Sequence, residues 1–297
     1  MKPPAMAAAA QDGAERHDYA VEYFVPRPSM WPIRTGIVLL LLVAGASLWL
    51  NGGEPGPGLL AVALLLLALV LIGWFRDIVG EGNQGVYDAQ VDRSFRWGMA
   101  TFIFTEVMFF GGLFATLFYV REISIPDLAH GLSAELWPGF KGGWPATGPG
   151  IDTPLHPMSW RGAPALNTII LLASGVAITW AGAAARSGKR TQLIIALALT
   201  LALGVRFLVG QAGEYHHAFS DLGLTLGLGA YGATFFILTG FHGLHVTIGA
   251  TMVAVVLART LMRQVTPTSH FILDAVSWYW HFVGVVWLLL FVVVYLL

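Results

Sequence analysis

The sequence predicts an all-α, polytopic membrane protein with seven transmembrane helices. Its 297 residues are 56% apolar and only 11% charged, and the mean hydropathy is +0.70, whereas roughly one quarter of the residues in soluble domains are charged. A transmembrane helix needs about 20 mainly apolar residues. Runs of that kind cover residues 33–50, 59–75, 95–119, 165–185, 191–213, 230–258 and 272–297.

The first two runs are short and are joined by Asn51-Gly-Gly-Glu-Pro-Gly-Pro-Gly58. Gly and Pro favour turns, so we expect these two helices to form an antiparallel hairpin. The chain then divides into an N-terminal tail over 1–30, the hairpin helices over 31–76, a loop over 77–94 and five helices over 95–297. The tail has no apolar segment with a cleavage site, so we expect it to be retained rather than removed as a signal peptide.

Lys and Arg are distributed unevenly between the two ends of the spans. If the N-terminus is cytoplasmic, twelve of the sixteen Lys and Arg residues lie on the cytoplasmic side, and only Arg121, Lys141 and Arg161 lie outside. Cytoplasmic loops carry an excess of these residues, so the tail and the 77–94 loop are predicted to be cytoplasmic and the C-terminus to be outside. The remaining cation, Arg206, lies inside the fifth span.

Two features of the composition exclude whole classes of site. The chain has no cysteine, which excludes structural disulfides, haem attached through thioether bonds and thiolate metal sites. Its formal net charge is −1, so nothing in the charge balance indicates nucleic acid as a partner.

Glu106 stands in the middle of the third apolar run. It follows Arg96 by ten residues, which at ~1.5 Å per residue places its carboxyl group ~15 Å deep, near the middle of a ~30 Å hydrocarbon core. Lipid cannot solvate a carboxylate, so this group must be protonated, paired or exposed to a polar cavity. An ionisable residue at that depth is a candidate functional residue.

His242 and His245 lie in the sixth run, three residues apart and so on one side of a helix. With Glu106 they form a candidate intramembrane polar cluster. It could be a structural hydrogen-bonded network, a proton-handling or lipid-orienting site, or a metal site. The metal interpretation is the weakest, because a di-iron centre needs several inward carboxylates and only Glu106 lies deep in a span. The spans also hold too few histidines for a dihaem or haem–copper centre, and no pair of histidines is obviously matched across two helices.

Polar residues near the ends of two other spans have simpler interpretations. Gln211, Glu214 and Tyr215 end the fifth run and are expected to cap the following loop by hydrogen bonds. His281, in the seventh run, needs a polar partner.

The segment 76–96 holds four acidic residues, Asp77, Glu81, Asp88 and Asp92, among three arginines. It is either a solvated connector or a surface that collects protons.

Six sequence blocks stand in order along the chain: Trp74-Phe-Arg-Asp-Ile, Phe102-Ile-Phe-Thr-Glu-Val-Met-Phe-Phe, Pro164-Ala-Leu-Asn-Thr-Ile-Ile-Leu-Leu-Ala-Ser-Gly, Gln211-Ala-Gly-Glu-Tyr, Tyr231-Gly-Ala-Thr-Phe-Phe-Ile-Leu-Thr-Gly-Phe-His-Gly-Leu-His-Val and Trp278-Tyr-Trp-His-Phe-Val. Together they resemble subunit III of cytochrome c oxidase. The resemblance runs from about residue 18 to the end. It implies a non-catalytic subunit of an aa3-type oxidase in a bacterial inner membrane, with its C-terminus in the periplasm.

The resemblance also implies partners and ligands. The chain itself would carry no cofactor; haem a and copper would lie in partner subunits, and subunit I of the oxidase would be the main contact. The first two helices would splay from a five-helix bundle, leaving a cleft filled with phospholipid. The candidate residues for lipid contact are Trp74, Arg76, Glu81 and Arg206. Glu106 takes the place of the family's midmembrane carboxylate, and the subunit would support proton uptake during respiration.

Some positions depart from the family pattern, and two alternative functions remain. Gly80 stands where relatives often have Arg, Gly284 stands where they have Asp, and Arg206 occupies a position that is usually uncharged. The closer alternative is a subunit III-like accessory protein of a nitric oxide reductase. The other, from a different class, is a stand-alone proton-coupled transporter, although the sequence shows no broken helices or ion-binding set.

Overall fold

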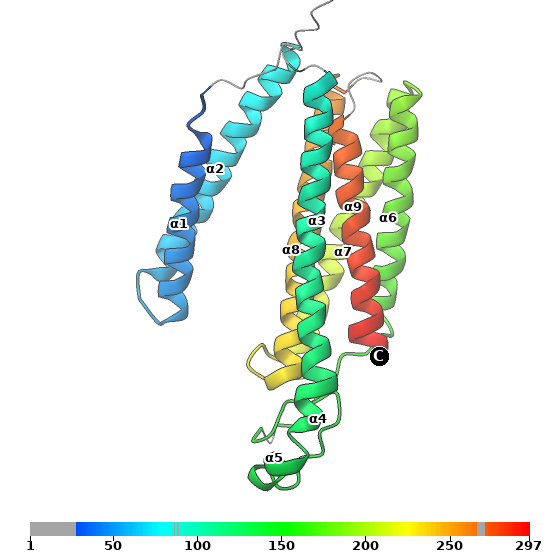
Figure 1. Ribbon diagram of the computed structural model, residues 1–297. Helices are drawn as coiled ribbons and strands as arrows, with labels where there is room; N and C mark the ends of the chain where they lie inside the picture. Colours follow the sequence, from blue (N-terminus) through cyan, green and yellow to red (C-terminus); the bar gives the residue numbers. More distant parts are fainter. Residues whose placement is uncertain (1–27, 86, 88, 152, 266–270) are drawn as a thin grey trace, which may run out of the picture. The chain divides into compact units, whose positions relative to one another are not determined.

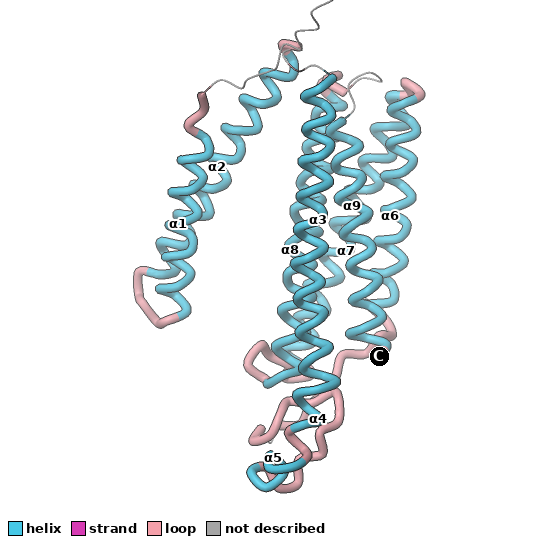
Figure 2. Tube along the Cα trace, in the orientation of Figure 1, coloured by secondary structure: helices cyan, strands magenta, loops and turns pink. Residues whose placement is uncertain are grey.

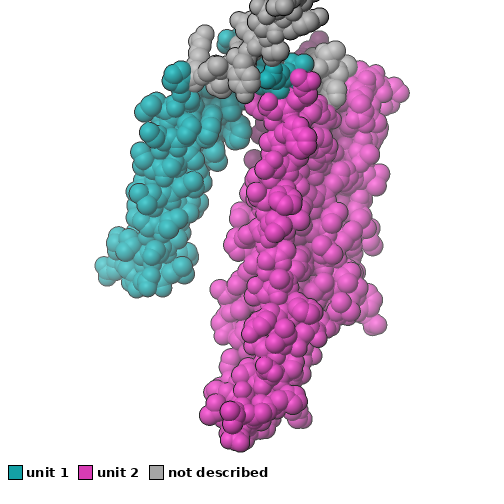
Figure 3. All heavy atoms as spheres, viewed as in Figure 1, with its two compact units in different colours: residues 1–91 teal, residues 92–297 magenta. Residues whose placement is uncertain are grey.

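The computed structural model describes residues 28–85, 87, 89–151, 153–265 and 271–297. All regular structure in these ranges is helical, as the sequence predicts, and seven helices are long and apolar enough to cross a membrane. The helices form two compact units, residues 1–91 and 92–297, which are described separately (Figure 3).

The first unit contains α1 (Trp31–Leu50) and α2 (Gly56–Asn83), which pack against each other in antiparallel fashion (Figure 1). Glycine lets the two backbones approach closely, because a Cβ atom at Gly45 would lie 2.7 Å from the backbone nitrogen of Leu60. At the other end of the hairpin, the indole N–H of Trp31 donates a 2.8 Å hydrogen bond to Asp77. The Gly/Pro-rich connector therefore joins two helices that are in contact along their length.

The second unit begins with α3 (Ala89–Tyr119), whose first turn contains the boundary between the units. The π-helical turn η1 (Val120–Ser124) and the short helices α4 (Ile125–Asp127) and α5 (Gly131–Leu136) follow it. The remaining spans are α6 (Ala163–Arg186), α7 (Arg190–Ser220), α8 (Gly229–Leu261) and α9 (Phe271–Leu290), which continues into the π-helical segment η2 (Phe291–Leu296) (Figure 2).

Small residues bring α6 and α7 together. Ala177, Ala181 and Ala185 of α6 are buried, and so is Ala196 of α7. Because the hydrophobic effect between helices is weak in lipid, close packing of small side chains is a main source of helix association there. Contacts between α7 and α8, α8 and α9, and α6 and α9 complete this part of the unit.

Two tryptophans of α9 fix that helix against α6. The indole N–H of Trp280 donates to Ser174 Oγ and that of Trp287 donates to Thr168 Oγ1, each over 2.9 Å. The ring of Trp280 also lies between two glycines, since a Cβ atom would come within 2.7 Å of it at Gly204 and within 2.9 Å at Gly249. One aromatic side chain thus contacts α6, α7 and α8.

The third span is held to α9 and η2 by polar contacts near its two ends. Arg96, in its second turn, forms a 3.1 Å salt bridge with Asp274 at the start of α9. Arg121, which directly follows α3, donates a 2.9 Å hydrogen bond to the backbone oxygen of Leu297. Between these points, the rings of Phe102 and Tyr279 stack with centroids 6.0 Å apart.

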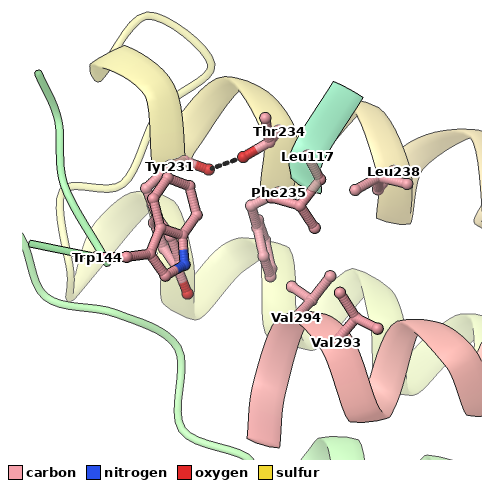
Figure 4. Close-up of a pocket in the computed structure, with 8 residues that line it drawn as sticks. All are labelled: Leu117, Trp144, Tyr231, Thr234, Phe235, Leu238, Val293 and Val294. Atoms are coloured by element: carbon pink, nitrogen blue, oxygen red, sulfur yellow. Dashed lines mark hydrogen bonds between the residues drawn. The ribbon is translucent and has the colours of Figure 1, made fainter. Parts of the chain in front are cut away.

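The long loop before α6 is bound to the start of α8. The backbone N–H groups of Ala230 and Tyr231 donate to Thr147 and Ala146, over 2.9 and 3.1 Å. Figure 4 shows Trp144 beside Tyr231 at one end of a small cavity of about 10 Å³, with Val293 and Val294 of η2 on another side. The loop is therefore ordered by specific contacts rather than by its Gly and Pro content alone.

Two helices extend beyond the apolar runs that predict them. Asp77 and Glu81, expected in a loop over 77–94, lie in the last two turns of α2, and Asp92 lies in the first turn of α3. The connection between these helices is short, since α2 ends at Asn83 and α3 begins at Ala89. Polar residues at the ends of a span do not interrupt its backbone hydrogen bonds, which explains why hydropathy underestimates the length of the helix.

Candidate functional site: an intramembrane glutamate–histidine pair

Glu106 of α3 pairs with His245 of α8. The Oε2 atom of Glu106 lies 2.9 Å from His245 Nε2, and the side chains are 20% and 9% exposed, respectively. The other ring nitrogen, Nδ1, lies 2.7 Å from the backbone oxygen of Phe241, one helical turn earlier. The carboxyl group in the middle of the third span therefore has a polar partner.

These contacts fix the number of protons between the two residues. A backbone oxygen can only accept, so Nδ1 of His245 must carry a proton. The contact between Nε2 and Glu106 then needs one more proton, which belongs either to a neutral carboxylic acid or to the imidazolium. In both arrangements the pair is neutral overall. It can hold one proton between two acceptors without placing a net charge in the membrane.

Aromatic rings surround the pair. Phe110 meets the imidazole of His245 edge to face at 5.0 Å, and Phe109 and Tyr279 lie more nearly parallel to it at 6.2 and 6.5 Å. Apolar walls lower the local dielectric and strengthen a hydrogen bond between the residues they enclose. The pair is thus a polar contact that joins α3 to α8 inside an aromatic environment.

His242 lies apart from this pair. It is fully buried, and its Nε2 lies 3.2 Å from the backbone oxygen of Val283 in α9. Its ring packs between Phe207 and Trp287, with centroid distances of 5.6 and 5.1 Å. A spacing of three residues leaves about 60° between the two histidines around the helix axis, which is enough to direct them toward different helices. Of the three predicted cluster residues, the structure brings Glu106 and His245 together.

His281 of α9 also has a partner. His281 Nε2 lies 3.1 Å from Thr179 Oγ1, a contact between α9 and α6. In the ranges that the structure describes, no three His, Cys, Asp or Glu side chains come together as a metal site would require. His242, His245 and His281 therefore act in separate hydrogen bonds between helices or to the backbone.

The candidate lipid contacts are divided between the two units. Trp74, Arg76 and Glu81 lie on α2; Arg76 is exposed, whereas Trp74 and Glu81 are half-buried. Arg206 is exposed on α7. The first three residues belong to the helical hairpin, whereas Arg206 belongs to the second unit. The two groups are therefore described separately.

Three of the four candidate proton-surface residues make specific contacts, and Asp88 lies outside the described residues. Asp77 accepts from Trp31, and Glu81 accepts a 2.6 Å hydrogen bond from the hydroxyl of Tyr87. Burial, together with the hydrogen bond and charge of Glu81, raises the pKa of Tyr87 to about 12. Asp92 pairs with Arg96 over 2.8 Å. These three carboxylates therefore also hold local structure together.

A second buried polar group was expected only as a helix cap. Gln211 and Glu214 are 5% and 3% exposed and lie within α7, which continues to Ser220. Their side-chain oxygens make no hydrogen bond of good geometry among the described residues, but Glu214 lies close to the hydroxyl of Tyr295 and Gln211 to that of Tyr215. Tyr215 differs, because its hydroxyl lies 2.8 Å from Thr239 Oγ1. The spacing of Gln211, Glu214 and Tyr215 indicated that these residues share one face of a helix. The predicted apolar run ended at residue 213, so the sequence did not indicate that this face is buried.

Comparison with known proteins gives a consistent result over nearly the whole chain. Residues 21–297 match the family described as Cytochrome c oxidase subunit III. The protein named Cytochrome c oxidase subunit 3 from Sus scrofa is 41% identical over 274 residues, which is 92% of this chain and 96% of the relative. The proteins of that name from Polypterus ornatipinnis and Cyprinus carpio are each 42% identical over the same shares.

Proposed function

Because this chain belongs to the cytochrome c oxidase subunit III family, and is therefore part of a haem–copper oxidase complex, we propose that it is the non-catalytic subunit III of an aa3-type cytochrome c oxidase. Such an enzyme transfers electrons from cytochrome c to O₂ and pumps protons. The observation that carries the proposal is the identity of about 41% over 92% of the chain.

Subunit I is the proposed main contact, and haem a and copper belong to the partner subunits. His242, His245 and His281 each contact a protein oxygen, and no two of them face each other across a common site in the described helices. That arrangement supports a role in holding helices together rather than in binding a redox centre. Within the complex, this chain stabilises the catalytic subunit.

Support of proton uptake is the second part of the proposal. The acidic residues near the α2–α3 connection, Asp77, Glu81, Asp88 and Asp92, would raise the local availability of protons at the cytoplasmic surface. Their contacts with Trp31, Tyr87 and Arg96 keep the described carboxylates at fixed positions. Glu106 and His245 hold a single proton inside the membrane, and we assign this pair a structural role that does not require proton transfer.

Phospholipid is the third part of the proposal. Most large apolar side chains of α1 and α2 that face away from the hairpin are exposed, including Leu40 and Ile72 at 69% and 66%. In a membrane, lipid or another subunit must cover them. We propose that phospholipid does so in a cleft beside this hairpin, with Trp74, Arg76 and Glu81 near the headgroups.

The proposed location is a bacterial inner membrane, with the N-terminus in the cytoplasm and the C-terminus in the periplasm. The seven spans make the chain a multi-pass membrane protein, and the uneven distribution of Lys and Arg supports this orientation.

Co-purification through an affinity tag on this chain tests the proposed function. The expected detergent extract has the absorbance of haem a together with copper. Haem b and haem c without haem a would instead indicate a nitric oxide reductase assembly, and an extract without haem would favour a stand-alone transporter. Either of these results would contradict the aa3-type assignment.

A further inference from the structure

A groove of about 440 Å³ opens beside the first turn of α6 and the outer half of α7. This volume lies in the ~300–1,000 Å³ range of small-molecule sites. Residues from the end of the preceding loop, including Ser159 and Arg161, form its rim, and α7 forms its long wall. The groove lies wholly within the second unit and is separate from the Glu106–His245 pair.

Two glycines of α7 shape the groove. A Cβ atom at Gly210 would lie 2.3 Å from Asn167 Oδ1, so this glycine lets α7 approach α6 closely. At Gly213, in contrast, a Cβ atom would have no neighbour within 4 Å. Gly213 therefore borders open space, and any larger side chain there would project into the groove.

Groups of both charge signs line the same groove. Glu214 is 3% exposed, and neither of its carboxyl oxygens makes a hydrogen bond of good geometry among the described residues. The hydroxyl of Tyr295 lies close to this carboxyl group and interacts with it. A carboxyl group has two acceptor oxygens, so Glu214 keeps acceptor capacity for a further donor. Arg161 and Arg206 are exposed and line the same groove. His217 lies at its edge, where Asp221 holds it over 2.6 Å.

This combination fits a ligand that carries both charges. A simple anion would satisfy the two arginines but would offer no donor to the buried carboxyl group, and a simple cation would do the reverse. A phosphate diester with a primary ammonium group satisfies both, because the phosphate accepts from guanidinium groups and the ammonium donates to a carboxylate. We propose that this groove binds the headgroup of phosphatidylethanolamine, with its phosphate at Arg161 and Arg206 and its ammonium at Glu214.

The position of the groove favours a lipid over a soluble ligand or a protein segment. It lies on two membrane-spanning helices, and Arg206 stands two helical turns deeper along α7 than Glu214, on the same side as the glycines. Val205 and Val209, which are 48% and 61% exposed, continue the surface of α7 beside the groove. Acyl chains attached to the headgroup would cover these valines. The site requires only a lipid bilayer, so it is independent of the type of oxidase.

The test uses the assembled complex in nanodiscs that contain equal amounts of phosphatidylethanolamine and phosphatidylglycerol, followed by native mass spectrometry of this chain with its retained lipids. The wild-type chain is expected to retain one more phosphatidylethanolamine molecule than the Arg206→Gln variant or the Gly213→Leu variant. Gly213→Leu removes no charge, so its effect reports occupation of the groove. Glu214→Gln is expected to keep a phospholipid but to lose about tenfold of the preference for the ethanolamine headgroup. Lys189→Gln, at the opposite end of α7, is the matched control and should behave as the wild type.

Several outcomes would overturn the proposal. Equal retention of both lipids by the wild type would remove the role of Glu214, and unchanged lipid counts in Arg206→Gln and Gly213→Leu would place the retained lipid elsewhere. Displacement by soluble glycerophosphoethanolamine at micromolar concentration would indicate a soluble ligand. Because the chain has no cysteine, Ser159→Cys can carry a unique photo-cross-linker. Capture of a polypeptide rather than a lipid at that position would identify the groove as a protein interface.

Discussion

The indole N–H of Trp280 donates a hydrogen bond to the hydroxyl of Ser174 over 2.9 Å, across the contact between α9 and α6. Ser174 in turn donates to the backbone oxygen of Leu171 over 2.7 Å. A buried indole thus finds an acceptor, and the hydroxyl that provides it is itself satisfied. This bond holds the ring in the narrow space between Gly204 and Gly249.

Enlarging Gly249 should destabilise this contact. In Gly249→Ala, the new Cβ atom would lie 2.9 Å from the ring of Trp280, which cannot move away without breaking its bond to Ser174. Overpacking of this kind costs about 1–3 kcal/mol, offset by up to ~1 kcal/mol from the better helix propensity of Ala. The measurement is the thermal unfolding midpoint of the purified complex. Gly243→Ala in the same helix, where a Cβ atom meets nothing within 4 Å, is the control; equal midpoints for the two variants would refute the packing argument.

The two substitutions Glu106→Gln and Glu106→Ala should have different effects. Glutamine can donate to His245 Nε2 and so replaces the proton that the pair shares, whereas alanine leaves a buried ring nitrogen without a partner, at a cost of about 1–3 kcal/mol. We expect the Gln variant to assemble and keep most activity, and the Ala variant to lose stability. Oxidase turnover and subunit retention are the measurements, and Glu135→Gln on exposed α5 is the control. A fully assembled Gln variant without turnover would instead make Glu106 a proton-transfer residue.

Tyr87 should make the α2–α3 connection sensitive to alkaline pH. Its pKa is raised from the ordinary value of 10.0 to about 12, by burial first and then by Glu81. A phenol with a raised pKa is stabilised in its neutral form, so its contribution to stability is complete below pH 10 and is lost as the pH rises toward 12. Absorbance of tyrosinate, compared between wild type and Tyr87→Phe, measures this titration. A Tyr87 component that titrates at its ordinary pKa would show that the contact with Glu81 is absent.

Neutralising Asp77, Glu81, Asp88 and Asp92 together should lower oxidase turnover at alkaline pH, where proton supply limits the rate. The effect is expected to be modest and to shrink as salt is added, because salt screens exposed charges. Neutralising four carboxylates on the other side, Glu54, Glu122, Asp127 and Glu135, gives a control set of the same size. If the variant keeps wild-type turnover at high pH, the acidic residues serve only the contacts described for them.

The sequence predicted the seven spans and their helical structure because a membrane imposes a length and an apolar composition on each span. Helix ends were less predictable, since Asp77 and Glu81 of α2 continue a helix that hydropathy ends at residue 75. The partner of Glu106 could be narrowed to two histidines by spacing. The choice between the two histidines depends on how α3 and α9 pack around α8. In the structure, His245 contacts Glu106 of α3 and His242 contacts the backbone of Val283 in α9.

Glu214 shows a different limit of sequence reasoning. Its run of apolar residues ends at 213, so it was placed at the membrane surface, where carboxylates are common. In the structure, α7 continues to Ser220 and its last turns are covered by neighbouring elements, which leaves Glu214 buried. Burial of a polar residue near the end of a span depends on loops and adjacent helices that local composition does not describe.

Polar contacts hold the third span to its neighbours at three positions along its length. Arg96, Glu106 and Arg121 bind Asp274, His245 and Leu297, with roughly 15 Å and 22 Å between successive fastenings along the helix axis. If one of these three contacts is lost, the other two still determine the position of the helix. The segment that has lost its contact can then bend. A mutation at Glu106 would therefore increase the mobility of the middle of the helix. A mutation at Arg96 or Arg121 would instead increase the mobility of one end.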